Sequence, residues 1–423
     1  MPKALSFATA FVYYFSNPKP QSYYDYTFRV AANVLRGRIG FAETPPSWLN
    51  EFVPLDGSYY SVFPLGSVIS MMPFAVLKVA GLIVDMPAAV ISALMAAAIA
   101  ILLAAMSVRY NISASRRYVM VAGILFGTWM WTNLTMAGAW QLALGFAMIG
   151  ELGAIYFTVY DRRPLLAGLF FALAFGNRTE IVLTAPIFFY LISRQPVAEV
   201  NIFPRETEKR VGDKTLKRSA VSGDPTGDAF AAPRFAKIRT IAAFCAVPFV
   251  LGVLTLVYNY VRFHSFTDFG YSRIPGVLAE PWYDHGIFSL YYIPRQMWEM
   301  LWRPWEVKTS FPYLMPNAFS SSILWSSPFL LSALRFGARD TRLKYAAWTA
   351  IIALCFLLWI HGNSGGWQFG YRYGMICLPW IFVVLLETAP KEIKLLEWAA
   401  YISSFAANAY ATWLFHWTNY LKP

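Results

Sequence analysis

The chain has 423 residues, of which 57% are hydrophobic and 14% are charged. Soluble domains contain about 25% charged residues, so this composition excludes an ordinary soluble protein and predicts an all-α integral membrane protein. The net charge is +12, but Lys and Arg occur in short clusters between apolar runs, as in cytoplasmic loops. We therefore expect no nucleic-acid partner. The three cysteines and four histidines show no ligand spacing, so neither a metal nor another cofactor is expected.

The apolar segments predict where the chain crosses the bilayer, since a spanning helix needs about 20 apolar residues. Residues 4–15 are expected to form a shortened first span. Residues 62–81 contain two prolines and a lysine and are expected to form an interfacial or re-entrant helix. Residues 165–193 are interrupted at 176–180 and are expected to form a hairpin of two short helices. The other candidate spans are 87–108, 118–133, 140–160, 238–260, 319–334, 345–360, 373–387 and 395–415.

The basic clusters predict the orientation, because Lys and Arg are enriched in cytoplasmic loops. All five clusters fall on one side if 62–81 does not cross. Residues 1–423 then form a single membrane domain with about eleven transmembrane helices and outer-face loops that carry interfacial helices. The first extracytoplasmic loop is 16–86 and the second is 262–318. The cytoplasmic loop 194–238 mixes charges with Gly and Pro and is expected to be disordered.

Two aspartates of the first predicted outer loop are candidate site residues. Asp25 lies directly before apolar residues spaced by three and four, a pattern that predicts a short amphipathic helix in the interface. At the start of that helix, the carboxylate is suited equally to capping and to catalysis as a base. Asp56 precedes a glycine, and the Asp-Gly pair favours ordinary turn geometry.

Two arginines are candidate phosphate ligands at the membrane edge. Arg372 begins the predicted span 373–387, and Arg178 lies within the interrupted hairpin. Either side chain can extend to lipid headgroups, or its planar guanidinium can clamp a phosphate. Glu180 is close enough in sequence to neutralise Arg178, so Arg372 ranks first.

Aromatic and polar residues gather in three predicted outer loops. Trp and Tyr at a bilayer surface can form the interfacial belt, and the same rings can stack on sugars. Composition alone does not separate these interpretations. Side chains at 363, 364 and 368 can bind a sugar or satisfy a glycine turn. The substrate-binding candidates in these loops are Tyr59, Tyr60, Tyr271, His361 and Trp367.

Taken in order, these segments resemble the GT-C glycosyltransferases. These polytopic enzymes use polyprenyl-phosphate sugars; bacterial and protein O-mannosyltransferases and the aminoarabinose transferase of lipid A are examples. The resemblance covers roughly residues 20–390 and rests on four segments in register on one predicted face. They are Asp25 with FRVAANVLRG (28–37), DGSYYSVFPLG (56–66), YNYVRFHSFTDFGY (258–271) and GGWQFGYRY (365–373).

The resemblance implies an inverting transfer of a sugar from a polyprenyl-phosphate donor to a lipid, glycan or protein acceptor. The reaction would occur on the extracytoplasmic side of a bacterial inner or plasma membrane. It implies that Asp25 is the general base and that Arg372 and Arg178 bind the lipid phosphate. Tyr26 stands where the family has a second acid beside the catalytic Asp, and the outer loops lack the Asp-x-Asp pair of the metal-dependent oligosaccharyltransferases.

Two other functions share many of these features. A membrane transporter or lipid flippase would also have many spans, a broken hairpin and an arginine at the membrane edge. The scarcity of ionisable residues near mid-membrane argues against it. A non-enzymatic envelope assembly protein would use the outer loops to bind a partner, particularly if Asp25 only caps a helix.

Overall fold

A computed structural model describes residues 2–18, 24–194 and 234–421. Helices make up 66% of the structure, which confirms the prediction of a mostly helical fold. The strands among the described residues form two short antiparallel hairpins. The predicted disordered loop 194–238 lies, over residues 195–233, outside the described part of the chain.

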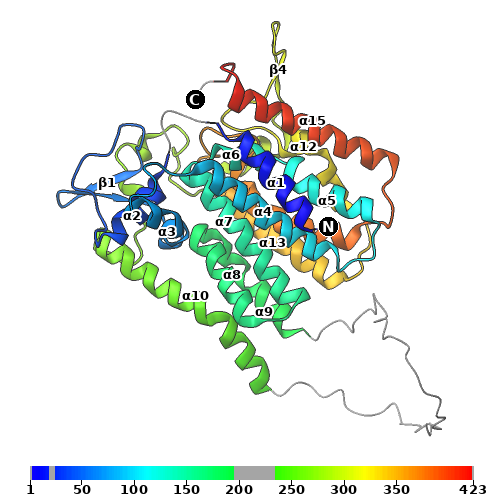
Figure 1. The fold of residues 1–423 in the computed structure, drawn as a ribbon, viewed down its shortest axis with the longest axis horizontal. Helices are drawn as coiled ribbons and strands as arrows, with labels where there is room; N and C mark the ends of the chain where they lie inside the picture. Colours follow the sequence, from blue (N-terminus) through cyan, green and yellow to red (C-terminus); the bar gives the residue numbers. More distant parts are fainter. Residues whose placement is uncertain (1, 19–23, 195–233, 422–423) are drawn as a thin grey trace.

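The first half of the chain contains one helix, a compact loop region with a strand hairpin, and a run of packed helices (Figure 1). The elements are α1 (Pro2–Ser16), α2 (Tyr26–Leu35), β1 (Phe52–Leu55), β2 (Ser58–Ser61), α3 (Leu65–Val79), α4 (Ala88–Ser107), α5 (Ala114–Phe126), α6 (Met130–Met136), α7 (Ala139–Ile155), the turn η1 (Tyr156–Tyr160), α8 (Pro164–Asn177), η2 (Thr179–Thr184) and α9 (Ala185–Ser193).

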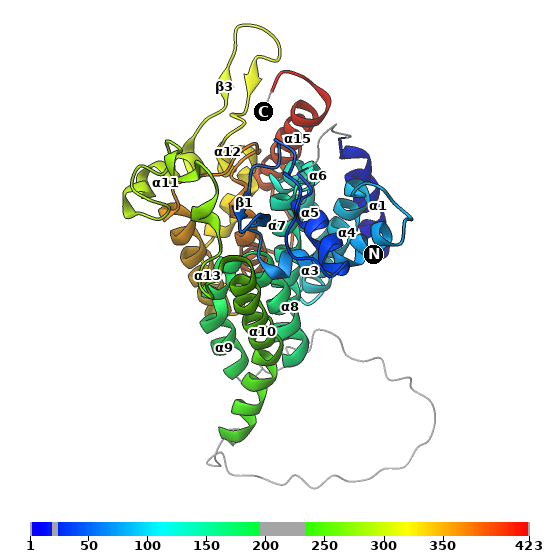
Figure 2. The same ribbon diagram turned by 90° about the vertical axis from the view of Figure 1, so that its left-hand side faces the viewer.

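The second half begins with the longest helix and then alternates short helical turns with longer helices. The elements are α10 (Arg234–Phe263), η3 (Tyr271–Arg273), η4 (Val277–Ala279), η5 (Leu290–Tyr292), α11 (Ile293–Met297), η6 (Trp298–Trp302), β3 (Glu306–Val307), β4 (Leu314–Met315), α12 (Ile323–Ser326), η7 (Pro328–Leu334), α13 (Thr341–Ile360), η8 (Arg372–Cys377), α14 (Leu378–Thr388) and α15 (Leu395–Trp417). Figure 2 shows the β3–β4 hairpin projecting from one end of the molecule and α8, α9 and α10 extending at the other.

Fewer helices than predicted are long and apolar enough to cross a membrane. Four described helices meet this requirement, and a pair bent by 46° raises the number to five: Ala88–Ser107, Ala139–Tyr160, Lys237–Phe263 and Thr341–Ile360, with Ala114–Phe126 and Met130–Met136 as the pair. About eleven transmembrane helices are therefore not confirmed. Several predicted spans are divided into shorter pieces. The segment 165–193 breaks after Asn177, as predicted, and 319–334 is split between α12 and η7 at Pro328, where proline interrupts a regular helix.

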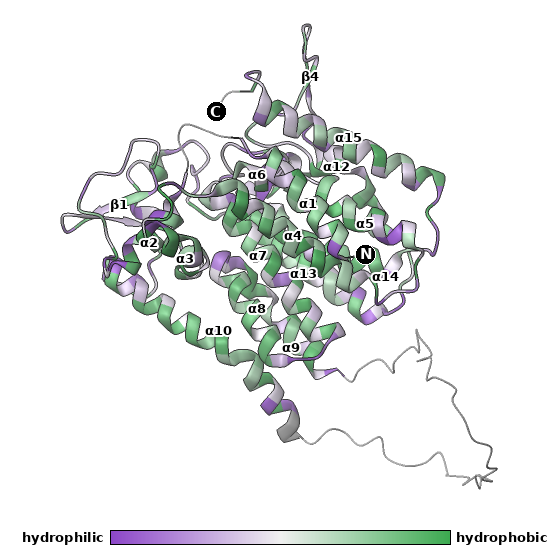
Figure 3. Cartoon of the chain, in the orientation of Figure 1, coloured by the Kyte–Doolittle hydropathy of each residue, from purple (hydrophilic) through white to green (hydrophobic). Residues whose placement is uncertain are grey.

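Two of the long apolar helices have opposite surroundings. Within its most apolar stretch α7 is 72% buried inside the structure, whereas α10 is only 11% buried. Figure 3 shows α10 as a largely hydrophobic helix on the flank of the molecule. A soluble protein rarely exposes an apolar helix surface as extensive as that of α10. These long apolar helices are compatible with a membrane protein.

The predicted first outer loop has a small core of its own, packed on the start of α7. Its buried members are Tyr26, Leu49, Phe52, Phe63 and Ala139. The β1–β2 hairpin is closed by Asp56 and Gly57, both at positive φ (51° and 72°). Asp-Gly favours this two-residue turn because both positions need left-handed backbone. The turn interpretation of Asp56 is therefore confirmed.

Arg262 joins this loop to the end of α10. Its guanidinium is fully buried and donates hydrogen bonds to the backbone carbonyls of Ser61 and Phe63, the latter at 3.1 Å. It also donates to Oδ1 of Asn259 at 2.7 Å. A buried charge is tolerated only when its donors are satisfied, so these carbonyls fix the loop against α10.

Candidate functional site

Segments far apart in the sequence meet around the ring of Tyr373, the second residue of η8. They come from the first loop, the start of α7, the break after α8, the loop after α10 and the loop between α13 and η8. We call this set the arginine–tyrosine cluster. Its members are Glu51, Trp140, Arg178, Glu180, Tyr271, Tyr283, His361, Arg372 and Tyr373.

Arg178 and Arg372 converge on the same aromatic ring. The guanidinium carbon of Arg178 lies 4.8 Å from the ring centroid of Tyr373, and that of Arg372 lies 5.1 Å from it. Cation–π attraction favours each contact, and together the two guanidinium groups make the surroundings of this ring positively charged. The arrangement therefore suits a bound anion, and guanidinium groups bind phosphate oxygens through paired hydrogen bonds.

The two arginines differ in what neutralises them. Arg178 pairs with Glu180, whose Oε1 lies 2.5 Å from Nη2 and 2.7 Å from Nε. Arg372 forms no ion pair within the described residues; its Nη2 donates to the Tyr373 hydroxyl at 3.3 Å, and its buried Nε has no hydrogen-bond partner there. Because an unsatisfied buried donor is costly, Arg372 is the stronger anion-binding candidate, in agreement with its predicted rank.

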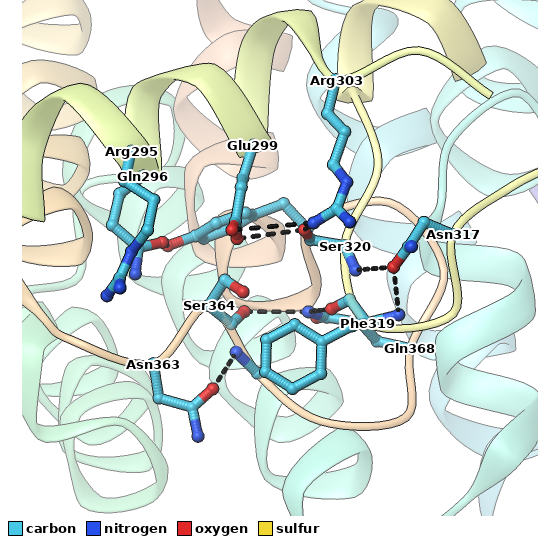
Figure 4. A network of polar contacts seen from close by, with 12 residues as sticks. Arg295, Gln296, Glu299, Arg303, Asn317, Phe319, Ser320, Asn363, Ser364 and Gln368 are labelled. Carbon is cyan, nitrogen blue, oxygen red and sulfur yellow. Dashed lines mark hydrogen bonds and ion pairs between the residues drawn. The ribbon is translucent and has the colours of Figure 1, made fainter. Parts of the chain in front are cut away.

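Side-chain amides brace the loop that carries Arg372 (Figure 4). Gln368 donates to the carbonyl of Ser364 at 2.9 Å and accepts a hydrogen bond from the backbone N–H of Arg372 at 2.8 Å. Asn363 accepts from the backbone N–H of Gly365 at 2.8 Å. These side-chain amides satisfy backbone hydrogen-bonding groups of the glycine-rich turn, which was one of the two roles considered for them.

The start of the same loop rests on Gln296 of α11, which is fully buried. Its side-chain amide donates to the carbonyls of His361 and Gly362, at 2.9 and 2.8 Å, and accepts from the Tyr371 hydroxyl at 2.8 Å. Both ends of the loop are therefore held by buried amides, which preorganises Arg372.

Glu51 brings a titratable carboxyl into the cluster. Its Oε2 accepts a hydrogen bond from the indole Nε1–H of Trp140 at 2.8 Å, and the Trp140 ring in turn lies 5.5 Å from the guanidinium carbon of Arg372. Burial raises the pKa of Glu51 to about 7, although the Trp140 hydrogen bond and the charge of Arg372 oppose the rise. A carboxyl with this pKa can exchange a proton near neutral pH.

Tyr26 holds Glu51 in position through its hydroxyl and its ring. The Tyr26 side chain is completely buried, and its hydroxyl donates to Oδ1 of Asn50 at 3.0 Å and accepts from the backbone N–H of Glu51 at 3.3 Å. Its ring lies 5.2 Å from that of Trp140. One side chain of α2 therefore orients both partners of the Glu51–Trp140 hydrogen bond.

Aromatic rings form another side of the cluster. The hydroxyls of Tyr271 and Tyr283 are 2.8 Å apart, and the His361 ring lies 5.8 Å from that of Tyr283 and 6.1 Å from that of Tyr373. Burial raises the pKa of both Tyr271 and Tyr283 and lowers the pKa of His361. These groups are therefore neutral hydrogen-bonding partners at physiological pH.

Asp25 lies beside the cluster rather than in it. It begins α2, as predicted, but its side chain makes no capping hydrogen bond. Instead, Oδ1 lies 2.6 Å from Nε of Arg29, one turn along the helix. The adjacent Tyr24 ring lies 5.2 Å from the Trp140 ring. The carboxylate is buried and paired with a cation, so the capping explanation is wrong and the catalytic one stays a prediction.

Within the described part of the chain, four other candidates form no polar or ring contact with the cluster's members, although Tyr59 and Tyr60 pack in the same hydrophobic groups as Trp140 and Tyr283. Asp56 occupies an exposed turn, where it contacts His264 at 2.9 Å. The Tyr59 hydroxyl is 3.1 Å from that of Thr44, the Tyr60 ring lies 6.3 Å from that of Phe263, and the Trp367 ring packs 5.1 Å from that of Phe415. The structure thus brings together four of the predicted residues, Arg178, Arg372, Tyr271 and His361.

Sequence reasoning missed Glu51, Trp140, Tyr283 and Tyr373. One sequence feature could have pointed to Glu51: it is an acid between Leu49 and the apolar pair Phe52 and Val53. Carboxylates in apolar surroundings are rarely buried unless they have a partner. Tyr373 adjoins Arg372 in sequence, but its contact with Arg178 depends on the tertiary fold.

Among the described residues, no group of three His, Cys, Asp or Glu could hold a metal ion. No protein-family model, no curated protein and no solved structure matches this chain. The geometry of the cluster therefore carries the functional argument.

Proposed function

We propose that this chain is an inverting glycosyltransferase of the GT-C type that moves a sugar from a polyprenyl-phosphate donor to a lipid, glycan or protein acceptor. The observation that carries the proposal is the convergence of Arg178 and Arg372 on Tyr373. Two guanidinium groups, of which only Arg178 is paired with a carboxylate among the described residues, favour an anionic ligand. A lipid phosphate meets this requirement, because the apolar helices near the cluster suit its hydrocarbon tail.

The reaction is a single displacement at the anomeric carbon. The acceptor oxygen forms a bond to that carbon, the bond from the carbon to the phosphate oxygen breaks, and the acceptor proton passes to a protein carboxylate. Attack opposite the leaving group inverts the configuration, as in inverting hydrolases. The departing lipid phosphate changes from a phosphodiester monoanion to a monoester dianion, and Arg372 and Arg178 stabilise the added charge.

The aromatic side of the cluster supports a sugar next to the phosphate. Tyr271, Tyr283 and His361 present neutral hydrogen-bonding groups and ring faces within the same set of contacts. A sugar is bound by hydrogen-bonding groups and by ring faces, so we place the transferred sugar on this side of the cluster. The family resemblance implies that Asp25 is the general base and that the active site faces the extracytoplasmic side of a bacterial inner or plasma membrane.

A transporter or lipid flippase is the second candidate, and one observation favours it. Glu151 lies within α7, is completely buried, and uses one carboxyl oxygen to accept from Trp380 at 3.0 Å, while its other oxygen has no partner among the described residues. An ionisable residue inside a long apolar helix often belongs to a transport path. Ionisable residues near mid-membrane were predicted to be scarce, and Glu151 would be one of them.

Sugar transfer by Arg372→Gln separates these functions. Membranes with the wild type are incubated with short-chain polyprenyl phosphates that carry radiolabelled hexoses or pentoses, and with extracted lipid, glycan and protein acceptors. We expect transfer by the wild type and a loss of about 100-fold in the variant, the size seen when one charge-stabilising donor is removed. Arg273→Gln is the control, because Arg273 also lies over an aromatic ring, that of Phe263, but outside the cluster, where it pairs with Asp268. Movement of the lipid across vesicles without sugar transfer would favour the flippase.

A further inference from the structure

We infer that Glu51, rather than Asp25, accepts the proton of the acceptor during transfer. This inference rests on the proposed function and adds the identity of the base. It follows from the contacts of the two carboxylates: Glu51 bonds to Trp140, which lies over Arg372, whereas Asp25 pairs with Arg29.

Glu51 is joined to the phosphate-binding residues through one side chain. Trp140 donates to its carboxylate at 2.8 Å and lies 5.5 Å from the guanidinium carbon of Arg372. Glu51 as a whole residue is partly exposed, and a role as base requires that an acceptor reach Oε1, the oxygen that Trp140 does not use. The carboxylate therefore lies beside the place where the anomeric carbon of a phosphate-bound sugar would be held.

Asp25 lacks both features. Its carboxylate is buried and is held 2.6 Å from the guanidinium of Arg29. Arg29 therefore occupies the oxygen Oδ1 of this carboxylate. Its neighbour Tyr26 supports Glu51 through the hydrogen bonds to Asn50 and to the Glu51 backbone. The start of α2 therefore positions the base, and Asp25 with Arg29 stabilises that helix end.

The charges around Glu51 fit a base that is neutralised as the phosphate gains charge. Groups that face it are Tyr26 of α2, Arg178 before η2, Tyr271 of η3, Glu280 after η4 and Arg372 of η8. The proton moves from the acceptor to Glu51 while the bonding electrons of the broken C–O bond pass to the phosphate. Negative charge thus leaves the Trp140 side and appears beside Arg372. With a pKa raised to about 7, Glu51 is ionised above neutral pH and binds a proton readily.

The test compares Glu51→Gln with Asp25→Asn in the transfer assay at pH 8. Glutamine keeps the oxygen that accepts from Trp140 and removes only the basic carboxylate. Binding of polyprenyl phosphate without a sugar, measured by quenching of tryptophan fluorescence, reports whether each variant retains a folded site. Glu306→Gln is the control, because Glu306 is an exposed carboxylate of β3 that pairs with Lys308.

We expect Glu51→Gln to bind polyprenyl phosphate like the wild type and to transfer sugar at least 100-fold more slowly, within the range for loss of a general base. Asp25→Asn should lose less than about tenfold. Glu51→Asp, which keeps a carboxylate on a shorter chain, should recover part of the rate. Transfer by Glu51→Gln within about threefold of the wild type, or loss of lipid binding in that variant, would overturn the inference. A wild type that transfers no sugar from any donor would instead overturn the proposed function itself.

Discussion

Two groups of buried arginines and glutamates show how the same residue types can serve structure in one region and ligand binding in another. Near the start of α15, Glu397 accepts from Nη1 and Nη2 of Arg116 at 2.7 and 2.8 Å and also contacts Arg335. In the arginine–tyrosine cluster, Arg372 has no carboxylate partner among the described residues.

The difference lies in the carboxylate partner and not in the Nε donors, since the buried Nε of both Arg116 and Arg372 lacks a hydrogen-bond partner among the described residues. Around Glu397 the carboxylate has two cations and the backbone N–H of Lys394 at 3.0 Å, which leaves little capacity for a ligand. Around Tyr373 the cations exceed their direct carboxylate partners, so an anion can complete the arrangement. The Glu397 carboxylate is thus saturated with partners, and removing one partner of such a buried pair is strongly destabilising, whereas the charge of Arg372 is available for binding.

The largest effect should come from the saturated group. Arg116→Gln should lower the free energy of unfolding by about 3 kcal/mol, because it leaves buried Glu397 with only Arg335. Thermal unfolding in detergent measures this. Arg163→Gln is the control, since Arg163 is exposed and its 3.1 Å pair with Asp161 should contribute under about 1 kcal/mol. If Arg116→Gln reduced transfer per folded molecule as strongly as Arg372→Gln, this would contradict the assignment of a structural role to the Glu397 group and a ligand-binding role to the arginine–tyrosine cluster.

A smaller effect should follow from removing one hydroxyl in the cluster's support. Tyr26→Phe keeps the ring packed on Trp140 but removes the hydrogen bonds to Asn50 and Glu51, so transfer should fall about tenfold. The measurement is kcat and KM with a short-chain donor. We expect kcat to fall with KM nearly unchanged. Tyr13→Phe is the control, since it removes a buried hydroxyl that bonds the carbonyl of Leu125 at 2.6 Å; an equal loss there would indicate general destabilisation.

The smallest effect concerns pH. Transfer should rise as pH increases through about 7, because Glu51 must lose its proton to act as a base. The charge of Arg178 lowers the pKa of Glu51, so Arg178→Gln should move the midpoint upward by a fraction of a pH unit. Rate–pH profiles of the variant and the wild type measure the shift. An unchanged or lower midpoint would contradict the assigned base, and Arg273→Gln should leave it in place.

Sequence patterns predicted the helical class, the break near Arg178, the Asp-Gly turn and the helix that follows Asp25, since each depends on local periodicity or turn chemistry. The number of spans was not confirmed, because 319–334 divides at Pro328 although its composition is apolar. Arg372 was ranked above Arg178 because Glu180 could neutralise Arg178; the structure shows that ion pair, and the phosphate-binding role stays a prediction. Glu51 was missed because its environment is produced by Tyr26 and Trp140, and no local pattern reports that contact.

The exposed apolar flank of α10 has a consequence for what counts as the folded protein. Only 11% of its most apolar stretch is covered by the rest of the chain, yet its last turn carries Arg262, which holds the first loop. The missing cover must come from outside the chain. If bilayer hydrocarbon supplies it, the lipid contributes to the stability of the fold as a packed helix would.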